Sequence, residues 1–306
     1  MKNIFTHGIQ ILLFCIYIIL TGCGFFNSNE PDPERGSINS TTSLLTIPNF
    51  LLQLSINSLP DQFKSAALSC ASKDTLTFYK LNYYTIGVDN ASLQTASTLV
   101  IIPKPYSKTS DKATLMLYLH GTISDRSQSP SKINKDDLAT IQYAEGGLGF
   151  ACSGLITVIP DYLGLGDDTS QIHPYLHGQS TASAAIDALR AAKYFLENDQ
   201  SIMIDTNIYI AGFSQGGYST LVTHHELQKN HEIEFTVKHS FPLSGPYDPD
   251  LMLTQLTSSK NYDGISFIPY AILSYLNAYN DFNDDISTIF NAKVAPIIET
   301  LYNMSN

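Results

Sequence analysis

A glycine-rich pentapeptide, Gly212–Gly216, places a serine at its centre and matches the pattern G-x-S-x-G. In this pattern a strand turns sharply into a helix, and the turn exposes the serine hydroxyl as a nucleophile. The positions two before and two after the serine have no space for bulky side chains. Apolar residues 208–211 precede the motif and a helical pattern follows it, which is the context that the motif requires. Ser214 is therefore the candidate nucleophile, and the alternative is a glycine-rich turn with a solvent-exposed serine.

A serine that attacks a carbonyl group needs hydrogen-bond donors for the oxyanion that forms. One predicted donor is the backbone N–H of Gln215, which begins the helix after the serine. The second should come from a loop after a neighbouring strand, where His120 is followed by Gly121 and Thr122. Gly121 allows the backbone to turn, so the N–H of Gly121 or of Thr122 is predicted to face the serine. The alternative is an ordinary turn at a strand end.

A nucleophilic serine also needs a base, and in hydrolases with this turn the chain order is serine, acid, histidine. No histidine follows His239, and those on the helix after Ser214 lie about three turns away from it, which is too far. The simplest interpretation is that the chain lacks the strands that would carry the acid and the histidine. The competing interpretation is a non-standard base that folds back over the site, either His173 or His177. The eight histidines are His7, His120, His173, His177, His224, His225, His231 and His239.

Six strands are expected to position these residues. They cover residues 76–86, 98–102, 114–119, 155–159, 208–211 and 235–243. The third to fifth runs are apolar throughout, which is typical of parallel strands covered on both faces. Helices are predicted over 180–197, with Ser180 as N-cap, and over 215–228. Alternation of strands and helices favours a doubly wound sheet.

The first of these helices carries Asp187 and Arg190, which are predicted to form an i,i+3 pair on its surface. After residue 247 the pattern changes, and residues 268–276 and 286–290 are predicted to be helical. Residues 265–268 could instead form a strand that Pro269 cuts short.

Four motifs in this order resemble the secretory-lipase-like branch of the α/β hydrolases. The resemblance covers roughly residues 75–250. It implies an α/β-hydrolase fold, with a mostly parallel sheet, helices on both faces and a helical lid-like insertion after the sixth strand. The lack of a late histidine indicates that the last strands of this fold are missing. The resemblance also implies a serine hydrolase that acts on carboxylic esters, acylglycerols among them, without a cofactor. Asp161, Gly164 and Gly166 have a plainer alternative as loop and turn residues. The motifs are Tyr118–Thr122, Pro160–Gly166, His173–Tyr175 with the helix that follows it, and Gly212–Gly217.

The N-terminus has the features of an export signal. Lys2 is followed by an apolar stretch over residues 9–20, which is short for a membrane span and suits a signal peptide. The stretch ends in Leu20–Cys23, which resembles a bacterial lipobox and implies that Cys23 is lipidated. An ordinary signal peptide and a short membrane anchor are the alternatives. We expect a signal peptide over 1–22, a lipid-anchored polar tether over 23–43, an incomplete hydrolase core over 44–247, and the lid-like insertion over 248–306, in a protein of the bacterial cell envelope.

Composition limits the partners further. The formal net charge of −11 makes nucleic acid an improbable partner, because the chain repels phosphate backbones. No metal site is expected, since neighbouring His224 and His225 point to different sides of a helix. Cys70 and Cys152 are predicted either to form one disulfide in an oxidising compartment or to remain separate thiols.

Two functions stay open at this point. One is a lipid-anchored esterase or lipase whose small ester or lipid substrate acylates Ser214. The other is a catalytically inactive surface lipoprotein that lacks the histidine.

Overall fold

The protein forms a seven-stranded sheet with the strand order β1-β2-β3-β5-β4-β6-β7. The computed structural model describes residues 34–48, 75–104, 112–144, 146–248, 251–252, 254, 258, 267–279 and 286–302. The predicted six strands are confirmed, and a further strand precedes them. The strands are β1 (Ile38–Pro48), β2 (Thr75–Ile86), β3 (Leu93–Lys104), β4 (Ala113–Leu119), β5 (Ile156–Pro160), β6 (Ile204–Phe213) and β7 (Thr236–Leu243).

The sheet is mixed, which corrects the expectation of a mostly parallel one. β1, β2, β3 and β5 pair with one another in antiparallel fashion. β5, β4, β6 and β7 pair in parallel. One of these antiparallel pairs has a short connection, since only antiparallel neighbours can be joined by a tight turn. Such a turn joins β2 to β3, where the Gly87 N–H donates to the Ser92 carbonyl at 2.8 Å.

Strand β1 begins at Ile38, inside the segment expected to be a polar tether. Its serines and threonines are mostly exposed, and only Leu45 and Ile47 are buried. An edge strand with one partner can carry such a pattern, because little of its surface has to be buried. Threonine also fits the extended backbone of a strand. The polar composition that favoured a tether is therefore compatible with a strand.

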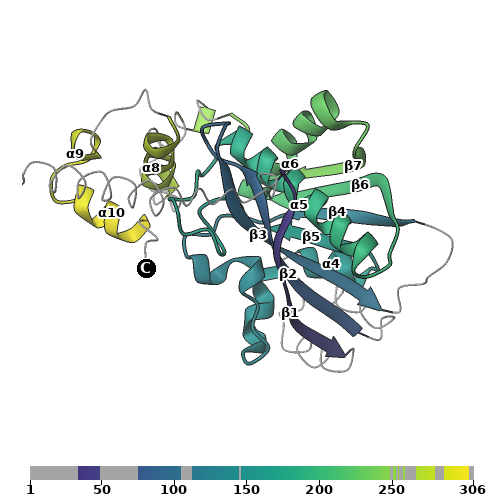
Figure 1. Ribbon diagram of the computed structural model, residues 1–306. Helices are drawn as coiled ribbons and strands as arrows, with labels where there is room; N and C mark the ends of the chain where they lie inside the picture. The colour runs from purple at the N-terminus through teal and green to yellow at the C-terminus, as the bar shows by residue number, and fades with distance from the viewer. Residues whose placement is uncertain are drawn as a thin grey trace, which may run out of the picture. The chain divides into compact units, whose positions relative to one another are not determined.

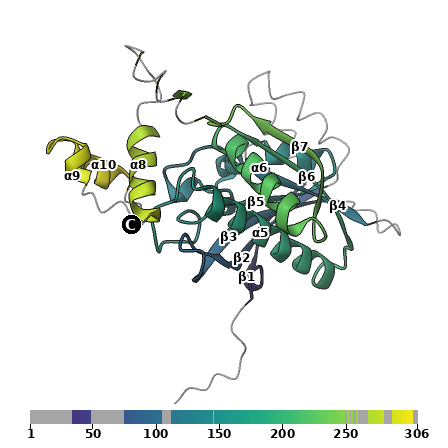
Figure 2. The ribbon, with the colours of Figure 1, turned by 90° about the horizontal axis from the view of Figure 1, so that it is seen from above.

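Helices cover the sheet on two faces. Figure 1 and Figure 2 both show α5 (Gly178–Asn198) and α6 (Gln215–Glu226) side by side on one face. Buried side chains of α5 form one core with β2–β6, and α6 packs against α5, β6 and β7. On the other face, α4 (Gly147–Cys152) helps to form a second core. Both long helices were predicted, although His177 and not Ser180 is the N-cap of α5. Shorter turns are the 3-10 helices η2 (Arg126–Gln128), η3 (Pro130–Lys132) and η4 (Leu138–Ala144), and the π-helical turn η5 (Leu227–His231).

Coverage of the second face stops short of β7. The side chains of Phe213, Phe241 and Leu243 share this face and are 55%, 48% and 53% exposed. In the part of the chain that the structure describes, no helix covers them. The expectation of helices on both faces is therefore confirmed at the centre of the sheet, and none of the described helices supports it at this edge.

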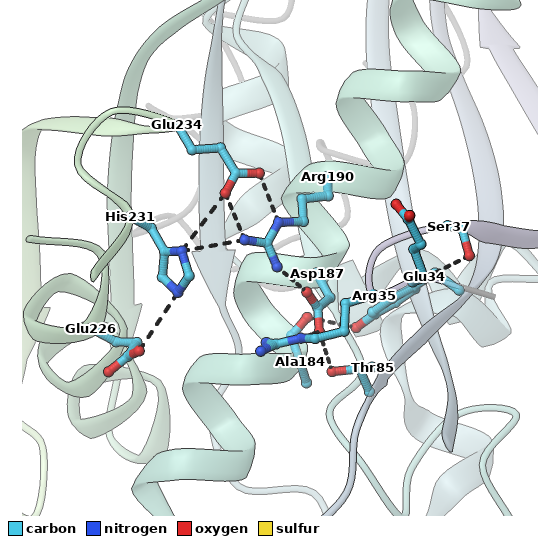
Figure 3. Close-up of polar contacts among 11 residues, drawn as sticks. Glu34, Arg35, Ser37, Thr85, Ala184, Asp187, Arg190, Glu226, His231 and Glu234 are labelled. Carbon is cyan, nitrogen blue, oxygen red and sulfur yellow. Dashed lines mark hydrogen bonds and ion pairs between the residues drawn. The ribbon is translucent and has the colours of Figure 1, made fainter. Parts of the chain in front are cut away.

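A partly buried charge network connects α5 to its surroundings (Figure 3). The Asp187 side chain is fully buried, not on the surface as expected, and accepts hydrogen bonds from Thr85 and Arg35 at 2.7 and 3.1 Å. Arg190 donates to Asp187 at 2.6 Å and forks onto both Glu234 oxygens at 2.6 and 2.7 Å. The hydrogen bond to Glu234 raises the pKa of Arg190. The predicted pair exists, but it is part of a larger network around the buried Asp187 carboxylate.

The C-terminal residues form three helices, which are α8 (Phe267–Ala278), α9 (Ile286–Ile289) and α10 (Ala295–Tyr302). The two predicted helical segments are confirmed, and Phe267 and Ile268 of the alternative strand belong to α8 instead. Proline is tolerated there because the first turn of a helix has no acceptor for its N–H groups. Buried residues of all three helices pack with Tyr175 of the core.

The predicted signal peptide and Cys23 lie outside the described residues. Among the residues that are described, no helix has the length and apolarity needed to span a membrane. Cys152 is disulfide-bonded. Its partner is also outside the described residues, where Cys70 lies.

Candidate active site

Ser214 occupies the turn between β6 and α6 in a strained conformation. Its φ of 57° and ψ of −121° are uncommon for a non-glycine residue and cost about 1–3 kcal/mol. Three backbone hydrogen bonds hold it there. The Ser214 N–H donates to Leu243 at 2.9 Å, and its carbonyl accepts from Gly217 and Tyr218 at 2.9 and 3.2 Å. The half-buried serine thus has the strand–turn–helix setting that the motif predicts.

The glycines of this turn are required by contact with backbone atoms. A Cβ at Gly216 would collide with the carbonyl oxygen of Leu119, and one at Gly212 with the carbonyl of Gly216. A Cβ at Gly217 would collide with the carbonyl of Leu243 at the end of β7. Backbone atoms cannot move aside as the end of a flexible side chain can. The sequence argument for small residues at these positions is therefore confirmed.

The loop with Gly121 and Thr122 leaves the sheet beside the serine. Leu119 ends β4 and pairs with Gly212 of β6, so the two parallel strands end at the same edge. The His120 ring Nδ1 lies 2.7 Å from the Gly121 oxygen and donates to it. In a trans peptide the C=O and N–H point in opposite directions, so the Thr122 N–H points away from that ring. Within the described residues, no acceptor binds the backbone N–H of Thr122 or of Gln215.

The Gln215 side chain is held from behind by His173. Its Nε2 lies 2.7 Å from Nε2 of His173, whose Nδ1 lies 2.7 Å from the carbonyl oxygen of Leu163. A carbonyl can only accept, so Nδ1 carries the ring proton and Nε2 accepts from the amide. Burial lowers the pKa of His173 to about 3, so the ring is neutral at pH 7. Both ring nitrogens are engaged, and neither is available to take a proton from Ser214.

Asp161 organises the loop after β5. Its carboxylate accepts from the Ser97 hydroxyl at 2.5 Å and from the Ser131 N–H at 2.9 Å. Burial raises its pKa. Gly164 and Gly166 both have positive φ in the same loop. These contacts fit the plainer alternative of loop and turn residues.

Several solved structures are similar to this chain. The ligand-bound form of the rice cell wall degrading esterase LipA from Xanthomonas oryzae is 29% identical, with a TM-score of 0.74 over 90% of this chain and 68% of that chain. A Legionella pneumophila protein is 25% identical, with a TM-score of 0.71 over 87% and 67%. Lipase A of Candida antarctica is 17% identical, with a TM-score of 0.58 over 89% and 56%. The chain is structurally similar to α/β-hydrolase esterases and lipases. No protein-family model matches the sequence, and no curated protein matches it.

Ser214 has no histidine partner in the described part of the chain. His177 caps α5, with its Nδ1 2.9 Å from the Ser180 hydroxyl. His239 stacks on Tyr209 at a centroid distance of 5.5 Å, and His231 lies 3.6 Å from Glu226. Since none of the described histidines hydrogen-bonds Ser214, the contacts of His173 and His177 give no support to a non-standard base.

Residues from distant parts of the chain also lie near the turn at Ser214. Tyr175 lies 3.1 Å from the Thr122 hydroxyl, and Tyr270 of α8 donates to the Ile123 carbonyl at 3.0 Å. The sequence contains no local signal for these contacts, because they join segments with no shared periodicity. Among the described residues, no cluster of three histidine, cysteine or acidic side chains could hold a metal.

Proposed function

We propose that the protein is a serine hydrolase that cleaves carboxylic esters, acylglycerols among them, through an acyl-enzyme on Ser214. The observation that carries the proposal is the strained conformation of Ser214 between β6 and α6, next to the end of β4. Such strain persists only where the surroundings enforce it, and it is typical of nucleophiles at this turn. Similarity to the LipA esterase at 29% identity supports the same class of chemistry.

The reaction has two halves. The Ser214 Oγ forms a bond to the ester carbonyl carbon, and the carbonyl electron pair moves to the oxygen. The N–H groups of Gln215 and of Thr122 or Gly121 stabilise that oxyanion. The intermediate collapses, the C–O bond to the alcohol breaks, and the alcohol leaves with the proton that Ser214 gave up. Water then adds to the acyl carbon, the bond between this carbon and Ser214 Oγ breaks, and a proton from the water returns to Oγ as the carboxylic acid leaves.

A covalent probe and a substrate test the proposal together. Purified protein should be labelled by an alkyl fluorophosphonate at Ser214 and should hydrolyse p-nitrophenyl butyrate. The Ser214→Ala variant is the control and should lose both signals. Turnover that persists in this variant would assign the activity to another residue. No labelling and no turnover in the wild-type chain would reject the enzyme proposal.

A second candidate is a catalytically inactive surface lipoprotein of the same fold. It is favoured by one observation, which is that no described histidine hydrogen-bonds Ser214. A neutral serine hydroxyl is a weak nucleophile without a base. The labelling experiment separates the two candidates, since an inactive chain reacts with the probe no faster than the Ser214→Ala variant.

We further propose that the protein is exported to the bacterial cell envelope and anchored by lipid on Cys23. The lipobox-like Leu20–Cys23 supports this proposal. The disulfide at Cys152 also supports it, because disulfides persist in oxidising compartments. Protein expressed in a bacterial host should enter the detergent phase in Triton X-114 partitioning, and a Cys23→Ser variant should stay in the aqueous phase. Equal partitioning of the two would reject the anchor.

A further inference from the structure

We infer that helix α8 positions both oxyanion donors, with Tyr270 and Ser274 as its two positioning residues. The inference rests on the proposed function, because it gives α8 a part in the same reaction. Tyr270 and Ser274 are four residues apart, so they lie one above the other on the same face of the helix. Both side chains are buried, at 1% exposure each.

The first set of contacts, made by Tyr270, reaches the loop that carries the Thr122 donor. The Tyr270 hydroxyl donates to the Ile123 carbonyl at 3.0 Å. The Tyr270 ring stacks on Tyr175 at a centroid distance of 4.8 Å and an interplanar angle of 20°. The Tyr175 hydroxyl in turn lies 3.1 Å from the Thr122 hydroxyl. α8 therefore contacts the backbone directly after Thr122 and supports the ring that holds the Thr122 side chain.

The second set of contacts, made by Ser274, reaches Gln215 through His173. The Ser274 hydroxyl lies 2.7 Å from the His173 carbonyl, and the His173 ring accepts from the Gln215 side chain at 2.7 Å. The Ser274 hydroxyl is shared with the Tyr270 carbonyl one turn earlier, at 2.8 Å. Ser274 thus fixes the backbone of the residue whose ring locks the first residue of α6.

Both sets of contacts start from the same helix, α8. The Thr122 loop and Gln215 belong to different segments, and an oxyanion hole works only when both donors keep a fixed separation. Tyr270 and Ser274 lie one helical turn apart and contact the two segments, so α8 can set the separation of the two donors. Displacements of about 1 Å are enough to cost around a hundredfold in rate. α8 would therefore act on the rate of the chemical step without touching the substrate.

Single-atom variants on α8 test the inference. Tyr270→Phe removes only the hydroxyl on Ile123, and Ser274→Ala removes only the hydroxyl on His173. The matched control is Tyr275→Phe on the same helix, whose hydroxyl lies 3.4 Å from the Leu176 carbonyl and contacts neither donor segment. For each variant we would measure the rate of fluorophosphonate labelling, kcat and KM for p-nitrophenyl butyrate, the urea midpoint, and amide hydrogen exchange by mass spectrometry.

A positioning role predicts that Tyr270→Phe and Ser274→Ala lower kcat and the labelling rate about tenfold, with KM within about twofold. Their urea midpoints should lie below that of Tyr275→Phe, because each variant loses a buried hydrogen bond, so kcat is compared per folded molecule. Exchange should rise about fivefold in peptides over residues 120–124 for Tyr270→Phe, and over 213–218 for Ser274→Ala. A lower urea midpoint with no change in kcat per folded molecule would overturn the inference, because the contacts would then contribute to stability alone.

Hydrogen exchange also separates this inference from the proposed function. If wild-type protein is neither labelled nor active, the enzyme proposal fails, while the exchange data still decide whether α8 holds the two segments. Raised exchange confined to each variant's own segment supports the inference. Unchanged exchange in both segments overturns it, whatever the activity.

Discussion

Mild acid is expected to destabilise the protein through His173. The ring is fully buried, donates from Nδ1 to Leu163, and accepts at Nε2 from Gln215. A proton on Nε2 would turn an acceptor into a donor that faces another donor, inside a site that water does not solvate. Burial accordingly lowers the pKa of His173 to about 3 in the folded protein, from 6.5.

The magnitude follows from these two values. Below pH 6.5 the unfolded chain binds a proton that the folded protein excludes. The stability from the neutral ring is therefore fully present above pH 6.5 and is lost as the pH falls toward 3. Between pH 7 and pH 4.5 the free energy of unfolding should fall by about 2.5 kcal/mol from this residue alone. Burial also lowers the pKa of His177, which adds a contribution of the same sign.

The range stops at pH 4.5 in order to exclude Asp167. Burial would raise the pKa of that carboxyl, but hydrogen bonds from Lys132 and Lys80 outweigh it and lower the pKa to about 2. Its own contribution to stability is lost only below about pH 4, where unfolded aspartate becomes protonated.

Urea unfolding at several pH values between 7 and 4.5 measures the effect. The comparison is between wild type and His173→Asn, which cannot titrate and keeps a donor near the Leu163 carbonyl. The variant should be less stable at pH 7, since it loses ring contacts with Tyr162 and Tyr270. Its loss on acidification should be smaller by about 2.5 kcal/mol. A His177→Gln variant controls for the second histidine. Equal acid-induced losses in wild type and His173→Asn would refute the reasoning.

Three further perturbations have defined outcomes. Gly216→Ala should lower the free energy of unfolding by about 2–4 kcal/mol and abolish labelling of Ser214, because the added Cβ collides with the Leu119 carbonyl. Urea midpoints and fluorophosphonate labelling measure the two effects, and a variant that is labelled normally would contradict the prediction. Asp187→Asn should lower the free energy of unfolding by about 3 kcal/mol, because Arg35 and Arg190 lose a buried anion. A decrease of less than about 1 kcal/mol in urea unfolding would contradict this, since surface ion pairs contribute that little. Reducing the disulfide at Cys152 should cost about 2–4 kcal/mol, seen as a lower melting temperature with dithiothreitol that a Cys152→Ala variant reproduces without reductant.

The parts of the fold that the sequence could predict are those with a local cause. The turn at Ser214 depends on glycines within five residues of one another, and the apolar runs of β4, β5 and β6 need no knowledge of their neighbours. Strand β1 was missed because an edge strand buries few residues and therefore leaves little pattern. Asp187 was placed on the surface because its helical partner is local, while Arg35 and Thr85 come from distant segments.

The candidate site divides in the same way. Ser214 and Gln215 follow from one motif, and the loop with Gly121 and Thr122 follows from its place after an apolar strand. The link between His173 and Gln215 joins two loops and has no periodic signal. The contact of Tyr270 with Ile123 joins residues 147 positions apart. Only packing of the whole chain reveals such contacts.

The order of strands in the sheet has a consequence for how the chain folds. β2 and β3 form a hairpin through a tight turn and can pair as soon as both leave the ribosome. The strand end beside Ser214 depends on pairing Leu119 with Gly212, which are separated by β5 and the long helix α5. Contacts between distant segments form slowly, because a large loop must close first. The serine would then acquire its strained geometry late, so the onset of fluorophosphonate labelling during refolding should lag behind the growth of strand signal.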